Sequence, residues 1–154
     1  MSRAFVKEDD EAPPELPDRV VSEHPNLVTE RGLKLIEAAV ASHERELAEA
    51  QGAEDREKIA AAHRELRYWT ARRQTAELQS PPSDCDEVRF GCKVTIERDD
   101  GRTQTFRIVG EDEADPGAET LSYVSPLARA LIGKEVGDRV RVGQSEAEIL
   151  KIEA

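Results

Sequence analysis

The chain has 154 residues, with 33 Asp and Glu against 22 Lys and Arg, and therefore a formal net charge of −11. This length suits one domain of ordinary size or two small units. The carboxylate excess argues against a general nucleic-acid binder, because phosphate contacts need clustered Lys and Arg. Apolar residues make up 38% of the chain and aromatic residues 4%, a lean core that favours an elongated, helix-rich protein.

Hydropathy and cysteine content indicate the compartment. The chain contains no run of 18 apolar residues, so we expect no membrane span and no membrane partner. The first ten residues lack the apolar stretch of a signal peptide, so we expect a cytoplasmic protein. The two cysteines, Cys85 and Cys92, are consistent with a reducing compartment. Because they form no Cys-x-x-C motif, we interpret them as incidental or packing residues.

Charge and proline divide the chain into three segments. The first 29 residues carry a net charge of −4 and four of the eight prolines, whereas the next 50 carry −1 and no proline. The remainder carries −6 and begins near Pro81 and Pro82. We therefore expect a mostly disordered acidic arm, a helical hairpin and a sheet domain over residues 1–28, 29–79 and 80–154. The arm is either a solvated tail or a segment that shields or competes for a basic surface on a partner.

The middle segment has the pattern of an antiparallel coiled coil. Thr29 can cap a helix that begins at Glu30, and Gly52 suits the left-handed residue that ends a helix. Apolar residues recur at heptad spacing on both sides of Gly52, which predicts two helices forming an arm of roughly 30 Å. The seam positions are Leu33, Ile36, Val40, Leu47 and Ala50, then Ile59, Ala62, Leu66, Trp69 and Ala76.

Two groups on the hairpin have metal-binding side chains. His43 and His63 lie near the seams, but no third or fourth zinc ligand stands at ligand spacing, so partly buried histidines are the better interpretation. The carboxylates around the predicted tip are Glu49, Glu54, Asp55 and Glu57. Such a cluster can hold Mg²⁺, which makes a metal-binding module one hypothesis. The alternative is helix capping, because we expect the last three in the first turn of the second helix, where the helix dipole favours acidic groups.

The third segment predicts an antiparallel sheet with one short helix, an α+β domain. An Asp-Asp-Gly turn at residues 99–101 separates two alternating strands, and Ser125 and Pro126 have the residue types of a helix start. We expect this helix to end at Gly133. The predicted strands cover residues 93–97, 103–109, 121–124, 139–142 and 147–152. The segment contains no phosphate loop, nucleophile elbow or Cys/His cluster.

Residues 121–138, which read LSYVSPLARALIGKEVGD, resemble the C-terminal domain of the bacterial transcript-cleavage factors GreA and GreB. That domain carries a Ser-Pro-(Leu/Met/Ile)-Ala-Arg-Ala-Leu helix, then Gly-Lys and a Val-Gly-Asp turn. Stretches within residues 90–110 also resemble GreB. Residues 27–32 and 67–69 resemble the start and the end of the family's coiled coil.

The resemblance implies an FKBP-like C-terminal domain that docks at the rim of the secondary channel of RNA polymerase, and a coiled coil that enters the channel. In the family, tip carboxylates help to hold a second Mg²⁺ at the polymerase active site, so that the polymerase cleaves its own backtracked RNA. The protein would then not be an enzyme itself and would bind no cofactor alone, sharing Mg²⁺ with the polymerase. We expect a monomer whose partner is core RNA polymerase and which reaches nucleic acid only through it.

The family's docking turn matches Ser125 and Pro126, with Tyr123 and Arg129 as further candidates beside it. The tip departs from the family's Asp-x-x-Glu-Asn-Ala-(Asp/Glu)-Tyr, leaving Glu54 and Asp55 as the acidic candidates, and each arm is shorter by more than a turn. One hypothesis is therefore cleavage stimulation. The alternative is a regulator similar to Rnk that occupies the channel without cleavage. A prolyl isomerase, suggested only by the FKBP-like sheet, is disfavoured because the domain has few aromatic residues to line its pocket.

Overall fold

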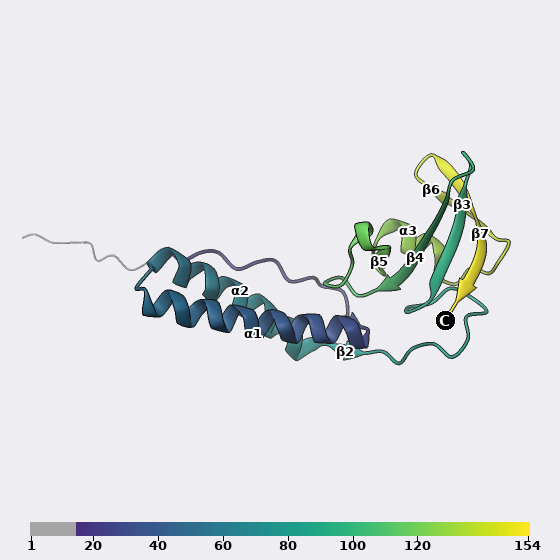
Figure 1. The fold of residues 1–154 in the computed structure, drawn as a ribbon. Helices are drawn as coiled ribbons and strands as arrows, with labels where there is room; N and C mark the ends of the chain where they lie inside the picture. The colour runs from purple at the N-terminus through teal and green to yellow at the C-terminus, as the bar shows by residue number, and fades with distance from the viewer. Residues whose placement is uncertain (1–14) are drawn as a thin grey trace, which may run out of the picture. The chain divides into compact units, whose positions relative to one another are not determined.

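The computed structural model describes residues 15–154, which form two compact units (Figure 1). The hairpin unit comprises residues 15–21 together with Glu37–Gln74. The sheet unit comprises Ser22–Ile36 together with Thr75–Ala154. The first turns of the first helix therefore group with the sheet domain rather than with the rest of the hairpin. In the part of the chain that the structure describes, no helix is long and apolar enough to cross a membrane.

Two helices form the predicted hairpin: α1 covers Glu30–Gly52 and α2 covers Arg56–Thr75. Thr29 caps α1 as predicted, because its hydroxyl oxygen accepts a hydrogen bond of 2.9 Å from the backbone N–H of Gly32. The prediction of a left-handed Gly52 was wrong. The residue with positive φ in this connection is Glu54, at 54°.

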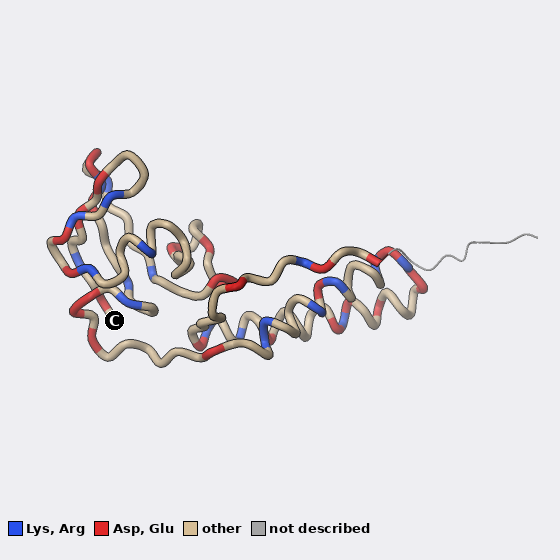
Figure 2. Tube along the Cα trace, turned by 180° about the vertical axis from the view of Figure 1, so that it is seen from behind, with Lys and Arg blue, Asp and Glu red and all other residues tan. Residues whose placement is uncertain are grey.

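The predicted seam supplies the buried side of both helices. Ile36 is fully buried, and Val40, Ala50 and Ala62 are no more than 4% exposed. Acidic and basic residues occur at many of the remaining positions, and Figure 2 shows them interspersed along the chain of the hairpin unit. The apolar stripe expected from heptad spacing is therefore the side that the protein removes from water.

Five strands form the sheet, in the order β5-β4-β3-β7-β6. Their bounds are Lys93–Arg98 for β3, Thr103–Val109 for β4, Thr120–Ser122 for β5, Arg139–Val142 for β6 and Ser145–Glu153 for β7. The sheet is antiparallel as predicted except at one edge, where β5 pairs parallel to β4. The acidic loop between them, with a short 3-10 helix η1 over Pro116–Ala118, carries the chain back so that both strands run the same way.

One hydrophobic core lies beneath this sheet and the short helix α3, Pro126–Leu131. Alternate residues of β3 and β7 enter it, as the period of two in a strand requires. Its buried members are Val88, Val94, Ile96, Ile108, Ala128, Leu131, Val140, Ala147 and Ile149. The core thus fixes α3 against the sheet and positions the turn that precedes α3.

A second, two-stranded parallel sheet was not predicted. β1, Leu27–Val28, pairs with β2, Glu77–Leu78, which joins segments about 50 residues apart. Gly110 allows β1 to approach closely, since a Cβ at that position would stand 2.2 Å from the carbonyl oxygen of Leu27. Residues 22–28 are therefore an integral part of the sheet unit.

The predicted disordered arm differs from the structure in its second half. Residues 1–14 lie outside the described residues, but residues 15–21 run beside α2 (Figure 1). The guanidinium carbon of Arg19 lies 3.8 Å from the ring centroid of Tyr68, and its Nη1 pairs with Glu65 at 2.8 Å. Arg64 donates a hydrogen bond of 2.8 Å to the carbonyl of Pro17. Aromatic and basic side chains of α2 therefore order a segment whose own composition predicts disorder.

The two cysteines are also not incidental. Cys85 and Cys92 form a disulfide, with Cα atoms 6.3 Å apart, and no described cysteine is free. Their spacing gave no sign of this, because a separation of seven residues is compatible with many loop conformations. The reading of these residues as simple packing groups is therefore wrong.

Candidate functional site

The turn before α3 has the geometry that its Ser-Pro sequence predicts. The hydroxyl oxygen of Ser125 accepts a hydrogen bond of 3.2 Å from the N–H of Ala128, and the same hydroxyl donates to the carbonyl of Ser122 at 2.7 Å. Pro126 occupies the first turn of α3, where its missing N–H has no intrahelical partner to lose. Ser125 thus shapes the turn, while Pro126 is exposed on the surface.

Tyr123 connects this turn to two distant segments. Its hydroxyl donates a hydrogen bond to the backbone carbonyl of Pro25. Its ring packs edge-to-face against Phe90, with centroids 5.7 Å apart and an interplanar angle of 77°. Tyr123 is thus half-buried and serves first to hold the turn in place.

Arg129 projects from α3 at the surface, with Nη2 3.3 Å from Nε2 of His24. His24 and Pro25 therefore belong to the same surface as the predicted candidates Tyr123, Ser125, Pro126 and Arg129. We call these six residues the docking surface, after the candidate role that the resemblance implies for the last four. Sequence reasoning missed His24 and Pro25 because they lie about 100 residues away from α3 and because composition assigned them to a disordered arm.

The hairpin tip presents its two candidate carboxylates differently. Asp55 caps α2, since its Oδ1 accepts a hydrogen bond of 3.1 Å from the N–H of Lys58. Glu54 lies in the connection rather than in the first turn of α2, which corrects the expectation, and it is exposed. Within residues 15–154, no three His, Cys, Asp or Glu side chains are placed to hold a metal ion.

His43 makes carboxylate contacts in the hairpin unit. Its Nδ1 lies 2.7 Å from Glu46 Oε2, and its Nε2 lies 3.8 Å from Glu65 Oε1. Glu65 also pairs with Arg19 from the N-terminal segment. This histidine therefore belongs to a polar network that links both helices to residues 15–21.

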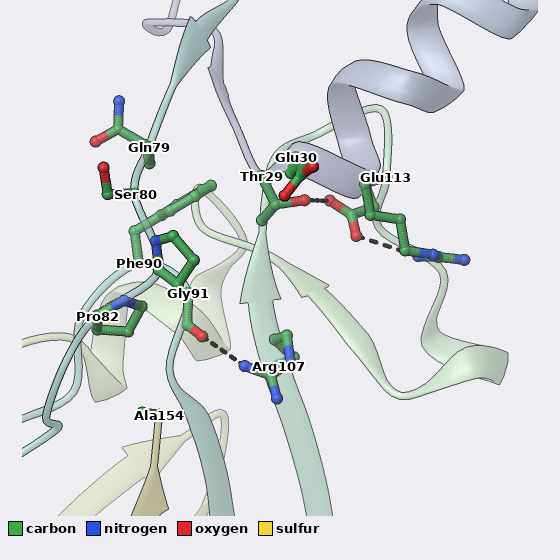
Figure 3. A pocket seen from close by; sticks show the side chains of 12 residues that line it. Thr29, Glu30, Gln79, Ser80, Pro82, Phe90, Gly91, Arg107, Glu113 and Ala154 are labelled. Carbon is green, nitrogen blue, oxygen red and sulfur yellow. Dashed lines mark hydrogen bonds and ion pairs between the residues drawn. The ribbon is translucent and has the colours of Figure 1, made fainter.

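A buried carboxylate braces the start of α1 within the sheet unit. Glu113, only 7% exposed, accepts hydrogen bonds from the Thr29 hydroxyl and from Arg31 Nη1, the latter at 3.1 Å (Figure 3). A Cβ on Gly32 would stand 2.7 Å from Glu113 Oε1, so glycine permits this approach. No local pattern in the sequence distinguishes Glu113 from the other acidic residues of its loop.

Next to Glu113 lies a cavity of about 360 Å³. Figure 3 shows Phe90 and Pro82 on one side of it and Thr29 and Glu113 on the other. Arg107 donates a hydrogen bond of 2.7 Å to the carbonyl of Gly91 beside this space. The cavity carries charges of both signs, so its lining does not select one class of ligand.

One carboxyl outside these sites has a shifted pKa. The backbone N–H of Arg102 donates to Asp100 Oδ1 at 3.0 Å, and this hydrogen bond lowers the pKa of Asp100 below its ordinary value. The Arg102 side chain adds to the shift through Nε, 2.7 Å from Asp100 Oδ2. Both contacts stabilise the turn between β3 and β4.

Comparison with known proteins finds similarity that includes the sheet domain. A family model described as "Transcription elongation factor, GreA/GreB, C-term" matches residues 82–154. The chain is 43% identical over 96 residues to transcription elongation factor GreB of Neisseria meningitidis serogroup B, covering 58% of this chain and 59% of the relative. It is 43% identical over 93 residues to transcription elongation factor GreA of Rhizobium leguminosarum bv. viciae, covering 57% and 58%.

These matches span a little under three fifths of the length of the curated relatives. Among solved structures, the GreA factor homolog Gfh1 of Thermus thermophilus aligns with a TM-score of 0.42 and 18% identity. That alignment covers 85% of this chain and 100% of the Gfh1 chain.

Proposed function

We propose that this protein, whose C-terminal domain belongs to the GreA/GreB family of transcription elongation factors, regulates elongation by binding RNA polymerase. The observation that carries the proposal is the docking surface. Ser125 caps α3 and thereby presents Pro126 and Arg129 at the surface of a family-matched domain. The proposal places the protein in the cytoplasm, where the polymerase works.

Binding at this surface would use an exposed proline and a nearby guanidinium. Pro126 contributes apolar area without a free N–H, and Arg129 contributes planar donors suited to a carboxylate of the partner. The hydroxyls of Tyr123 and Ser125 form hydrogen bonds within the protein, so their role is to keep the turn in one conformation. Preorganisation of this kind lowers the entropic cost of association.

The hairpin would occupy the secondary channel, and its tip decides between two versions of the function. Carboxylate oxygens are ligands that Mg²⁺ accepts, and an Mg²⁺ shared with the polymerase active site would stabilise the attacking and leaving oxygens of RNA cleavage. Glu54 is exposed, whereas Asp55 already uses one oxygen to cap α2. Because the helix cap engages one oxygen of Asp55, this carboxylate is less free to bind Mg²⁺. This favours the alternative, in which the hairpin occupies the channel without stimulating cleavage.

Co-purification with core polymerase tests the docking proposal. The wild-type protein should be retained, and Arg129→Glu should lose most of that retention because it reverses a charge at the docking surface. Lys134→Glu is the matched control: it reverses an exposed charge outside the defined surface and should be retained like wild type. Equal retention of both variants, or no retention of wild type, would contradict the proposal.

Backtracked complexes incubated with Mg²⁺ separate the two versions. Cleavage stimulation predicts shortened RNA that disappears with Glu54→Gln plus Asp55→Asn. These substitutions remove the charges, while Asn keeps the capping oxygen of residue 55. The control Glu49→Gln plus Glu57→Gln removes two other carboxylates near the tip and should leave cleavage intact. RNA of unchanged length with bound wild-type protein would establish occupancy alone.

A further inference from the structure

The backbone holds Cys85 and Cys92 where a disulfide can form or open. Their Cα atoms are 6.3 Å apart, within the range that a disulfide bridges without moving the main chain. They are the only two cysteines of the chain, so no other intrachain pairing competes. Cys92 is fully buried, whereas Cys85 is partly accessible to solvent. An external thiol or disulfide would therefore meet Cys85 first.

The loop that this disulfide closes contacts the polypeptide on both sides of the docking turn. Val88 is 1% exposed, its N–H donates to the carbonyl of Lys134 and its own carbonyl accepts from the N–H of Gly133, both at 2.8 Å. These contacts tie the loop to the segment that follows α3. Phe90 packs edge-to-face on Tyr123, which precedes α3. A change in the conformation of the loop would thus affect the segments at both ends of α3.

We propose that the Cys85–Cys92 pair is a redox-controlled clasp that holds the docking surface in its binding conformation. This inference rests on the proposed function, because the cytoplasm keeps most thiols reduced and its disulfides are usually transient or redox-sensing. In the disulfide form, residues 85–92 are closed into a ring and Phe90 supports Tyr123. In the dithiol form, the ring is open, and Val88 and Phe90 leave their positions more often.

The exchange with glutathione disulfide balances as two substitutions at sulfur. The Cys85 thiolate attacks one sulfur of glutathione disulfide, which forms a mixed disulfide and releases one glutathione thiolate. The Cys92 thiolate then attacks the Cys85 sulfur and releases the second glutathione thiolate. The two protons lost by the cysteines go to the two glutathione molecules, and the protein dithiol supplies the two electrons that reduce glutathione disulfide.

The expected effect on binding follows from the fraction of protein with the docking surface in place. If the dithiol form holds that conformation one tenth of the time, its apparent affinity for polymerase falls by about tenfold. Loss of the disulfide should also lower the unfolding temperature of the sheet domain by roughly 10 °C, because the unfolded chain gains entropy when its eight-residue loop is no longer closed.

The first test equilibrates the full chain in buffers of graded ratios of reduced to oxidised glutathione and traps free thiols with a polymer-linked maleimide. If the Cys85–Cys92 pair is redox-controlled, it should change from dithiol to disulfide as the proportion of oxidised glutathione rises. A disulfide that persists at every ratio, or one that never forms, would overturn the proposal. Cys85→Ser is the control, because it leaves the buried Cys92 in place and cannot form the intrachain bond.

The second test compares the affinity of the two forms for core polymerase. The oxidised wild type should bind about tenfold more tightly than the reduced protein, while Cys85→Ser should bind like the reduced protein under both conditions. Equal affinities of the oxidised and reduced forms would overturn the clasp. If neither form binds, the proposed function has failed instead.

In that case, amide hydrogen exchange of the protein alone tests whether the disulfide holds the loop in place. Faster exchange of the Val88 and Gly133 amides in the reduced form would support it, since both amides hold the loop to the end of α3. Unchanged protection of these amides would overturn it.

Discussion

The hydroxyl of Tyr123 donates a hydrogen bond to the backbone carbonyl of Pro25, a residue 98 positions earlier in the chain. Beside this bond, Arg129 meets His24 from the same N-terminal segment. Two stretches that local pattern assigns to different parts of the protein thus form one surface. Because His24 and Pro25 lie beside the Ser125–Pro126 turn, the N-terminal segment is part of the proposed polymerase contact.

Tyr123→Phe tests the structural role of that bond. The variant keeps the ring against Phe90 but leaves the Pro25 carbonyl without its donor, so the free energy of unfolding should fall by about 1 kcal/mol. Urea denaturation measures the loss, and hydrogen exchange should show less protection in residues 22–28. Full retention of both properties would show that the bond contributes nothing to the position of this segment.

Gly110→Ala tests the close approach of β1. The new Cβ would collide with the carbonyl oxygen of Leu27, so we expect a loss of at least about 2 kcal/mol in the free energy of unfolding or displacement of β1. Gly52→Ala is a matched control, because no atom lies within 4 Å of a Cβ there and its φ is not positive. At that helical position alanine should raise stability by about 0.5 kcal/mol.

Glu113→Gln tests the buried carboxylate at the start of α1. The amide preserves the shape of the side chain but loses the charge that pairs with Arg31, so stability should fall by about 1–3 kcal/mol. Chemical denaturation measures this change. Glu119→Gln serves as the control, since Glu119 is exposed and should change the free energy of unfolding by less than about 0.5 kcal/mol. Equal effects of the two substitutions would contradict a bracing role.

Asp100 gives a prediction about pH. Its pKa is lower in the folded protein than in the unfolded chain, so its contribution to stability is present above the unfolded pKa and is lost as the pH falls through the folded value. Carboxyl NMR titration should find this lowered pKa. In Arg102→Ala most of the lowering should remain, because the backbone N–H of residue 102 is its largest cause. A return of the pKa to the ordinary aspartate value in that variant would show that the side chain dominates.

The elements that sequence predicted correctly depend on neighbouring residues. Thr29 caps α1, Ser125 caps α3, and the Asp-Asp-Gly turn joins β3 to β4, because each needs only residues within a few positions in the chain. The same holds for the apolar seam of α1, which heptad spacing reveals. The candidate residues Ser125 and Pro126 could be selected from the sequence for this reason, because the capping signal and the motif of the resemblance coincide in one short segment.

What the sequence by itself determined is therefore the set of local elements, the hairpin with its acidic tip and the resemblance of the C-terminal domain to the GreA/GreB factors. Only the tertiary structure decided that β5 runs parallel to β4, that Cys85 bonds Cys92, that Glu113 is buried and that Pro25 meets Tyr123. Periodicity and capping follow from the local geometry of the chain. Contacts between distant segments depend instead on which surfaces the whole chain buries together, and no local pattern records that choice.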